Sequence, residues 1–328
     1  YGISQNPESF AVYGYNKYFA DKNNNVILRL SNNGLDEISS AGMRDYFRDE
    51  LNSLDVAGQP GFIMGGWDLY NSQYVVSTQE NTVYNPNTTV YNTLSFDETV
   101  QGWTSFYDYL PNQMFSLRNN FYTIKSTRLW KHYSTTVNRG SFYGIDSDYW
   151  NHVTEDIDYD SNVTFVFNPE PTRSKYFKTI RYEGNNGWEV DSYYSDQTGQ
   201  DPTVTPAGNW HMLTDQGLPI TSYLEGEYVF NPAGGAPVTR ANYNATLGTT
   251  EPALPRYHAG FDRKENSYVA NLVNNSSAMQ AEVIFGSDIS GLKGFYLTVK
   301  MSTEFTTNPG GEKQLFSVGT NYEMNNGY

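Results

Sequence analysis

Cysteine is absent from the 328 residues, which excludes a disulfide framework and thiolate metal sites and fits assembly in a reducing cytoplasm. The chain also lacks a hydrophobic run long enough to cross a membrane, which excludes an integral membrane helix. Basic residues are scarce: 21 Lys and Arg stand against 36 Asp and Glu, for a formal net charge of -15. Sequence-specific binding of DNA or RNA needs a Lys/Arg-rich footprint, so this balance argues against it.

Aromatic residues are what the chain has in abundance, with 28 Tyr and 18 Phe. Tyr suits the half-buried face of a sheet, because its ring packs while its hydroxyl reaches solvent. A length of 328 residues allows two domains or one large architecture of many short strands. These features predict a folded β protein with a core of Tyr, Phe and Val.

The clearest strand signals lie between residues 119 and 187. Residues 163–167 alternate in polarity, and residues 121–125 and 128–133 form a predicted hairpin around Ser126-Thr127. A third run, from Tyr176 to Tyr182, follows a corner with two prolines that cannot lie inside a central strand. This pattern predicts an antiparallel, aromatic-rich sheet.

The rest of the chain predicts three parts. Residues 1–190 show a rhythm of about four strands per ~40–45 residues, which favours β-propeller-like blades, although a stack of antiparallel sheets would have the same rhythm. One short helix interrupts them, with a buried stripe at Met43, Phe47 and Leu51 and a cap at Ser39 or Ser40. Residues 191–256, rich in Gly, Pro, Thr and Asp, predict long loops or an insertion.

Residues 257–328 predict a smaller, β-sandwich-like antiparallel unit. A strand at residues 282–285 is expected to pair with one at 295–301, and residues 314–318 form the returning strand. The predicted fold class is therefore all-β, with propeller-like sheets first and a sandwich-like unit last.

A search for catalytic chemistry yields no catalytic, cofactor-binding or metal-ligating residue and no cofactor. Acidic residues 155, 156, 158 and 160 alternate like the start of a calcium loop, but Ser161 stands where that loop needs glycine. A solvated acidic loop explains them better than a weak cation site. The four histidines are scattered without a zinc motif, and His132 reads as a packed or hydrogen-bonded sheet residue: His132, His152, His211, His258.

A glycosidase is the enzymatic alternative. It needs two carboxylates across a cleft lined by aromatic side chains. The residues chemically suited to this are Asp97, Glu98, Asp108, Trp103 and Tyr107. Pairs of this kind arise by coincidence in a chain with 36 acidic residues, so a non-catalytic interpretation is favoured.

Several stretches resemble large virion structural proteins of tailed double-stranded-DNA bacteriophages, of the cyanophage and crAss-like kind. These stretches are Asn6–Asp49, Gly65–Ser77, Phe96–His132, Phe167–Val190, Ala259–Asn275 and Glu282–Glu304. The likeness is to the C-terminal part of a longer protein, which agrees with a chain that begins at Tyr1.

This resemblance implies a non-enzymatic subunit of the virion, repeated in the tail or portal-proximal apparatus as part of a nozzle, muzzle, tube or baseplate. The implied partners are further copies in a symmetric oligomer and other virion proteins, after assembly in the bacterial cytoplasm. The segment at 191–256 is a candidate for contact between subunits. Plain solvent-exposed connections explain it equally well.

The acidic balance fits two interpretations. It suits a surface that genomic DNA passes without adhering, because like charges repel, and it equally suits a protein that must stay soluble in a saline setting. The competing functions are a tail protein that binds or degrades host glycans and a decoration protein of the capsid.

Overall fold

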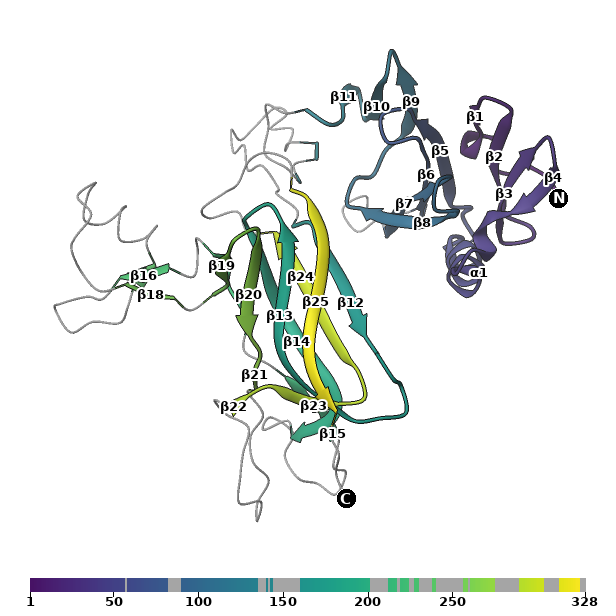
Figure 1. Ribbon diagram of the computed structural model, residues 1–328. Helices are drawn as coiled ribbons and strands as arrows, with labels where there is room; N and C mark the ends of the chain where they lie inside the picture. Colours follow the sequence, from purple (N-terminus) through teal and green to yellow (C-terminus); the bar gives the residue numbers. More distant parts are fainter. Residues whose placement is uncertain are drawn as a thin grey trace. The chain divides into compact units, whose positions relative to one another are not determined.

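The computed structural model describes residues 1–56, 58–81, 90–134, 140, 142–143, 160–200, 212–216, 219–223, 227–229, 238–239, 256–258, 260–274, 289–303 and 313–324. They are mostly strands in antiparallel sheets, so the predicted all-β class is confirmed (Figure 1). The chain divides into unit 1, residues 1–136 with 141–159, and unit 2, residues 137–140 with 160–328. In the described part of the chain, no helix is long and apolar enough to cross a membrane.

Unit 1 consists of sheets whose strands follow one another along the chain. The first sheet has the order β1 (Ala11–Tyr13), β2 (Asn16–Asp21), β3 (Val26–Ser31), β4 (Gly34–Glu37). The second has the order β5 (Phe62–Asp68), β6 (Gln73–Gln79), β7 (Tyr91–Asp97), β8 (Gly102–Tyr107). The third comprises β9 (Gln113–Leu117), β10 (Asn120–Lys125) and β11 (Arg128–Lys131), so the predicted hairpin at 121–133 is confirmed.

Close backbone approach at two glycines of β5 fixes how unit 1 packs. A Cβ on Gly65 would clash with the carbonyl oxygen of Ser9, at the end of the short 3-10 helix η1 (Pro7–Ser9). On the other side, a Cβ on Gly66 would lie 2.7 Å from the Cβ of Met114 on β9. The second sheet therefore has a neighbour on each side, and β6 is buried along almost its whole length.

Two apolar clusters fill the spaces beside this central sheet. One joins the first and second sheets and contains Tyr18, Ile27, Tyr74 and Phe96 among others. The other joins the second and third sheets through Val75, Tyr109, Met114 and Phe121. Three consecutive meanders stacked in this way agree with the predicted rhythm, while closure into a propeller stays a prediction.

The predicted helix is α1 (Arg44–Ser53). Of its expected buried stripe, Phe47 and Leu51 are fully buried, whereas Met43 precedes the helix and is half-buried. The predicted cap is wrong. Ser39 and Ser40 belong to a separate 3-10 helix, η2 (Ile38–Ser40), and α1 begins after Met43 without a side-chain cap. The Oγ of Ser39 instead accepts a hydrogen bond from the backbone N–H of Ile27 and donates one to the carbonyl oxygen of Ile27. Ser39 therefore binds the neighbouring strand β3.

Unit 2 is a β-sandwich whose strands come from distant parts of the chain. One sheet has the order β12 (Asn162–Phe167), β24 (Leu297–Thr303), β14 (Trp188–Gln200), β15 (Met212–Gln216). The other contains β19 (Asp262–Lys264), β20 (Ser267–Asn271), β13 (Lys175–Gly184) and β23 (Leu292–Gly294), with β25 (Leu315–Met324) paired to β13. Two small sheets are separate from these: a three-stranded sheet of order β17 (Val238–Thr239), β16 (Glu227–Val229), β18 (Arg256–His258), and the pair β21 (Val273–Asn274) with β22 (Ile289–Ser290).

Apolar side chains from both sheets meet in one core, which makes the sandwich a single packing unit. Val190, Leu297 and Val299 contribute from the first sheet. Phe177 and Tyr182 contribute from the second. The predicted strands at 163–167 and 176–182 are present as β12 and β13, but they belong to this core rather than to a blade of unit 1.

One of the predicted pairings of the C-terminal part is wrong. Residues 297–303 of β24 are occupied on both edges, by β12 on one side and β14 on the other. Residues 282–285, the expected partner of residues 295–301, lie outside the described residues. The strand expected to return onto residues 295–301 pairs with β13 in the opposite sheet.

The boundaries at 190 and 256 do not coincide with the boundary between the two units. Within the expected loop segment, β14 extends to Gln200, and β15, β16 and β17 follow. Most of the remaining residues of that segment lie outside the described part of the chain.

Candidate functional site

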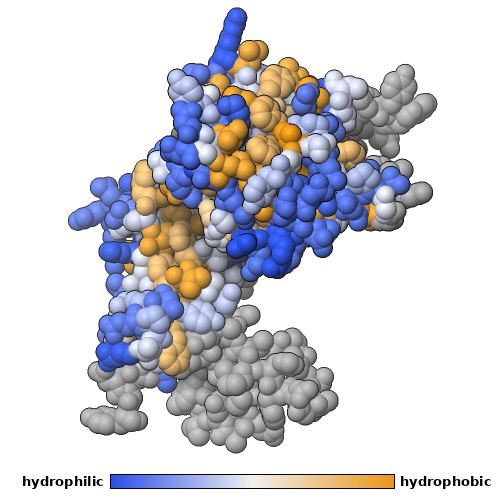
Figure 2. Space-filling view, turned by 90° about the vertical axis from the view of Figure 1, so that its right-hand side faces the viewer, coloured by the Kyte–Doolittle hydropathy of each residue, from blue (hydrophilic) through white to orange (hydrophobic). Residues whose placement is uncertain are grey.

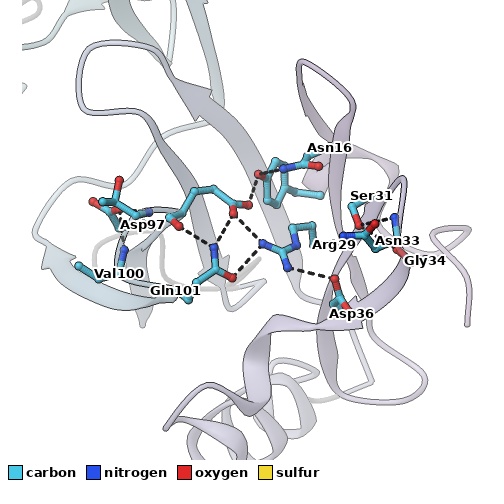
Figure 3. A network of polar contacts seen from close by, with 12 residues as sticks. Asn16, Arg29, Ser31, Asn33, Gly34, Asp36, Asp97, Val100 and Gln101 are labelled. Carbon is cyan, nitrogen blue, oxygen red and sulfur yellow. Dashed lines mark hydrogen bonds and ion pairs between the residues drawn. The ribbon is translucent and has the colours of Figure 1, made fainter.

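The most extensive polar site of unit 1 centres on Arg29 of β3 (Figure 3). Its Nη1 donates to Glu98 Oε2 at 2.6 Å and to Gln101 Oε1 at 3.0 Å, and its Nη2 donates to Asp36 Oδ2 at 3.0 Å. The Tyr18 hydroxyl of β2 donates to the other oxygen of Glu98. The network thus joins the first sheet to the turn between β7 and β8.

The charges within this network are balanced by their neighbours. The Arg29 side chain is 17% exposed and the Glu98 side chain 23%, so the pair is partly withdrawn from water. Burial works to lower the pKa of Arg29, but hydrogen bonds and attraction from Asp36 and Glu98 raise it on balance. A guanidinium held between two carboxylates stays charged, which suits a fixed connection between sheets better than proton transfer.

A second polar contact joins the second and third sheets at Asp68, the fully buried last residue of β5. Its Oδ1 accepts from the backbone N–H of Tyr70 at 2.8 Å, and its Oδ2 accepts from the Tyr133 hydroxyl at 2.5 Å. Burial raises the pKa of Asp68, although these hydrogen bonds oppose the shift. The carboxylate closes the β5–β6 turn and fixes Tyr133, and both oxygens are engaged.

His132 lies in an aromatic cluster of the third sheet. Its Nε2 lies 2.8 Å from the Thr123 hydroxyl, which also accepts a hydrogen bond from Tyr143. The rings of Tyr109 and Phe121 pack against the imidazole, and burial lowers the pKa of His132 to about 4. The predicted packing and hydrogen bonding of His132 are therefore confirmed, although the residue lies just beyond the end of β11 (Arg128–Lys131).

The carboxylates considered for a glycosidase do not meet across a cleft. Asp97 accepts from the backbone N–H of Thr99, and Glu98 is held by Arg29. Asp97 pairs with Gly102 at the start of β8, whereas Asp108 follows the end of that strand. The length of β8 separates their backbones by roughly 20 Å at ~3.3 Å per residue. Paired carboxylates of glycosidases lie about 5 to 9.5 Å apart.

The two aromatic residues proposed with these carboxylates serve as packing residues. Trp103 packs on Phe47 and donates from its Nε1 to the Ile38 carbonyl at 3.0 Å. Tyr107 stacks on Tyr109 at a centroid distance of 5.2 Å. Neither ring lines a cleft between paired acids.

Among the residues that the structure describes, no group of three His, Asp or Glu side chains could hold a metal ion. Of the acidic run at 155–160, only Asp160 lies in the described part, and it is exposed. His152 and His211 lie outside the described residues. His258 is part of β18.

Unit 2 contains a buried lysine that sequence patterns gave no reason to single out. Lys175 is fully buried at the start of β13. Its Nζ donates to the backbone carbonyls of Glu170 at 3.0 Å and Arg173 at 2.8 Å. Those bonds tie the Pro-containing corner at 169–174 to the sandwich. The Arg29–Glu98 contact was equally hidden, because 69 residues separate its members.

Comparison with protein families finds a known domain that lies mostly in unit 2. Residues 156–275 match the Crassvirus muzzle protein C-terminal domain. No curated protein matches the chain. The resemblance to virion structural proteins of crAss-like phages is thus confirmed for this region, and the match supports a virion structural protein. The stretches of unit 1 that carried the same resemblance lie outside the match, and there it stays a prediction.

Proposed function

We propose that this chain, whose residues 156–275 match a crAss-like muzzle domain, is a non-enzymatic structural subunit of the phage tail or portal-proximal apparatus. The nozzle, muzzle, tube and baseplate are the positions considered, and the muzzle is the one that the matched family names. Repeated copies would assemble symmetrically and contact other virion proteins.

The observation that carries this proposal is the position of the match on the fold. It spans β12, β13, β14 and β20, which supply much of the sandwich core. The polar groups of unit 1 support a passive role, because Arg29, Asp68 and His132 each connect elements of the fold. The acidic balance would limit adhesion of genomic DNA if the chain faces its path.

A reconstruction of the intact particle by electron cryomicroscopy tests the proposal. The expected result is density for the sandwich of unit 2 in several copies around the tail axis. Density on the capsid shell or at fibre tips would overturn it, and would favour a decoration or host-recognition protein.

A further inference from the structure

The sandwich of unit 2 is less well closed on one side than on the other. Among the described residues, six partly buried apolar side chains pack against its core, and five of them lie on β12 and β25: Val163, Phe165, Phe167, Leu315 and Val318. These strands end the two sheets, and Figure 1 shows them on the same side, away from β19. The core therefore reaches the surface along this side.

Both strands offer an open edge. β12 pairs with β24 and β25 pairs with β13, and in the described residues no further strand lies on the outer edge of either. Outward N–H and C=O groups on such an edge form a template for another strand. Val166 of β12 is 63% exposed and Phe316 of β25 is 71% exposed. Figure 2, which faces the side where β12 lies in Figure 1, shows apolar side chains gathered there.

The charge pattern distinguishes this side from the opposite one. β12 has no charged residue, and β25 has one in ten, Glu323, which pairs with Lys178. At the other end of the second sheet, β19 consists of Asp262, Arg263 and Lys264, all exposed. Charged residues on an edge strand prevent pairing between molecules. Among the described residues, charged side chains protect the β19 edge, whereas the β12 and β25 edges lack this protection.

A second copy of this chain fits the open side. Two copies, each with a net charge of -15, repel one another over most of their surfaces. That repulsion is weakest at β12, which has no charged residue, and at β25, whose one charged residue, Glu323, pairs with Lys178. A contact made by the same side of both copies is isologous and closes as a two-fold dimer.

We propose that two copies of this chain pair edge to edge through β12 and β25, extending both sheets of the sandwich across a two-fold axis. An axis perpendicular to the sheets keeps the core-facing side chains of both copies on one side. Phe165 and Phe167 of each copy would then join one continuous core. This inference rests on the proposed function in taking the chain as a subunit that assembles with itself.

The test is the oligomeric state of the full chain and of a double variant, Val166→Lys with Asn321→Lys, measured by mass photometry over a dilution series. Both substituted residues are exposed on the open strands. We expect the wild type to form dimers that salt strengthens, because salt screens the repulsion between copies. The double variant should raise the dissociation constant at least tenfold.

The matched control is Glu265→Lys, in the exposed turn between β19 and β20, which changes the net charge by the same two units. It should dimerise as the wild type does. Circular dichroism establishes that each variant is folded. Hydrogen exchange on the wild type gives an independent readout, since amides of β12 and β25 should gain protection as concentration rises.

A wild type that stays monomeric, or a dimer as tight in the double variant as in the wild type, overturns the inference. A monomer found in the tail would overturn this interface and leave the proposed function standing. If the double variant weakens the dimer but the chain is found on the capsid, the interface stands and the proposed function is overturned.

Discussion

The two units reach a similar content of antiparallel sheet by opposite routes. In unit 1, each sheet is a meander of consecutive strands, and polar contacts such as Arg29–Glu98 and Asp68–Tyr133 connect one sheet to the next. In unit 2, neighbouring strands come from distant parts of the chain: β12 lies beside β24, and β13 beside β25. Apolar packing between two sheets then dominates.

This difference has a consequence for how each unit loses structure. Meanders can open one sheet at a time, because each is closed by local turns. A sandwich whose central strands bridge distant segments loses several pairings together. Local unfolding in unit 1 and cooperative unfolding in unit 2 are therefore expected.

Removing a core ring from each unit is the strongest challenge to this contrast. Phe177→Ala on β13 deletes a fully buried ring and should lower the free energy of unfolding by about 3–5 kcal/mol. Since β13 pairs with β20, β23 and β25, amides in all of these strands should lose protection together in hydrogen exchange.

The matched variant in unit 1 is Phe121→Ala on β10, which is equally buried. It should release the third sheet, β9 to β11, while β1 to β4 keep their protection. Uniform loss of protection throughout unit 1 would show that its sheets unfold as one body, and the contrast would fail.

The same contrast explains how much of the fold could be predicted. The hairpin at 121–133 and the strand rhythm of unit 1 could be predicted from the sequence, because turn residues and alternating polarity are local signals. The partners of β24 and β25 were not, because alternation predicts a strand and its faces but leaves open which strand lies beside it. Residues 314–318 were therefore predicted to be a local hairpin partner.

The residues of the candidate site also differ in how far the sequence could predict their roles. His132 could be assigned from its place in a strand pattern, and its contact with Thr123 lies within one hairpin. Glu98 attracted notice as a possible catalytic acid, but its partner Arg29 lies 69 residues away and no spacing links them. Lys175 carried no signal, because its Nζ is satisfied by backbone carbonyls rather than by an acidic side chain.

A pH titration sharpens the comparison through His132, which is buried in unit 1. Its pKa falls from 6.5 to about 4 on folding, chiefly through burial, so the folded state favours the neutral ring. The stability that this provides is complete above pH 6.5 and is lost as the pH falls towards 4. The shift corresponds to about 3 kcal/mol.

His132→Phe keeps a ring against Tyr109 and Phe121 but removes the titration. Denaturant unfolding at pH 7 and pH 4.5 should show a smaller loss of stability in this variant than in the wild type, with hydrogen exchange locating the difference in β9 to β11. Equal losses in both proteins would mean that His132 is not the group that titrates.

The smallest expected difference between the units concerns their ion pairs, Arg29–Glu98 in unit 1 and Lys178–Glu323 in unit 2. A fully buried pair costs about 3–5 kcal/mol when one partner is removed, and an exposed pair about 0–1. Glu98 is 23% exposed and Arg29 keeps Asp36 as a second partner, so Glu98→Gln should cost about 1–2 kcal/mol. Lys178→Gln breaks the exposed pair with Glu323 in unit 2 and should change stability by less than ~0.5 kcal/mol.

A coupling free energy between Arg29 and Glu98 would show whether the two side chains stabilise the fold together or independently. The double variant Arg29→Met with Glu98→Gln should lose less stability than the sum of the two single variants. Glu98→Gln alone leaves the charge of Arg29 beside a weaker, neutral partner, and Arg29→Met removes that charge. Urea unfolding of the three variants gives the coupling free energy. Additive losses would mean that packing, rather than the Arg29–Glu98 contact, holds the first sheet on the second, and the two units would then rest on the same kind of interaction.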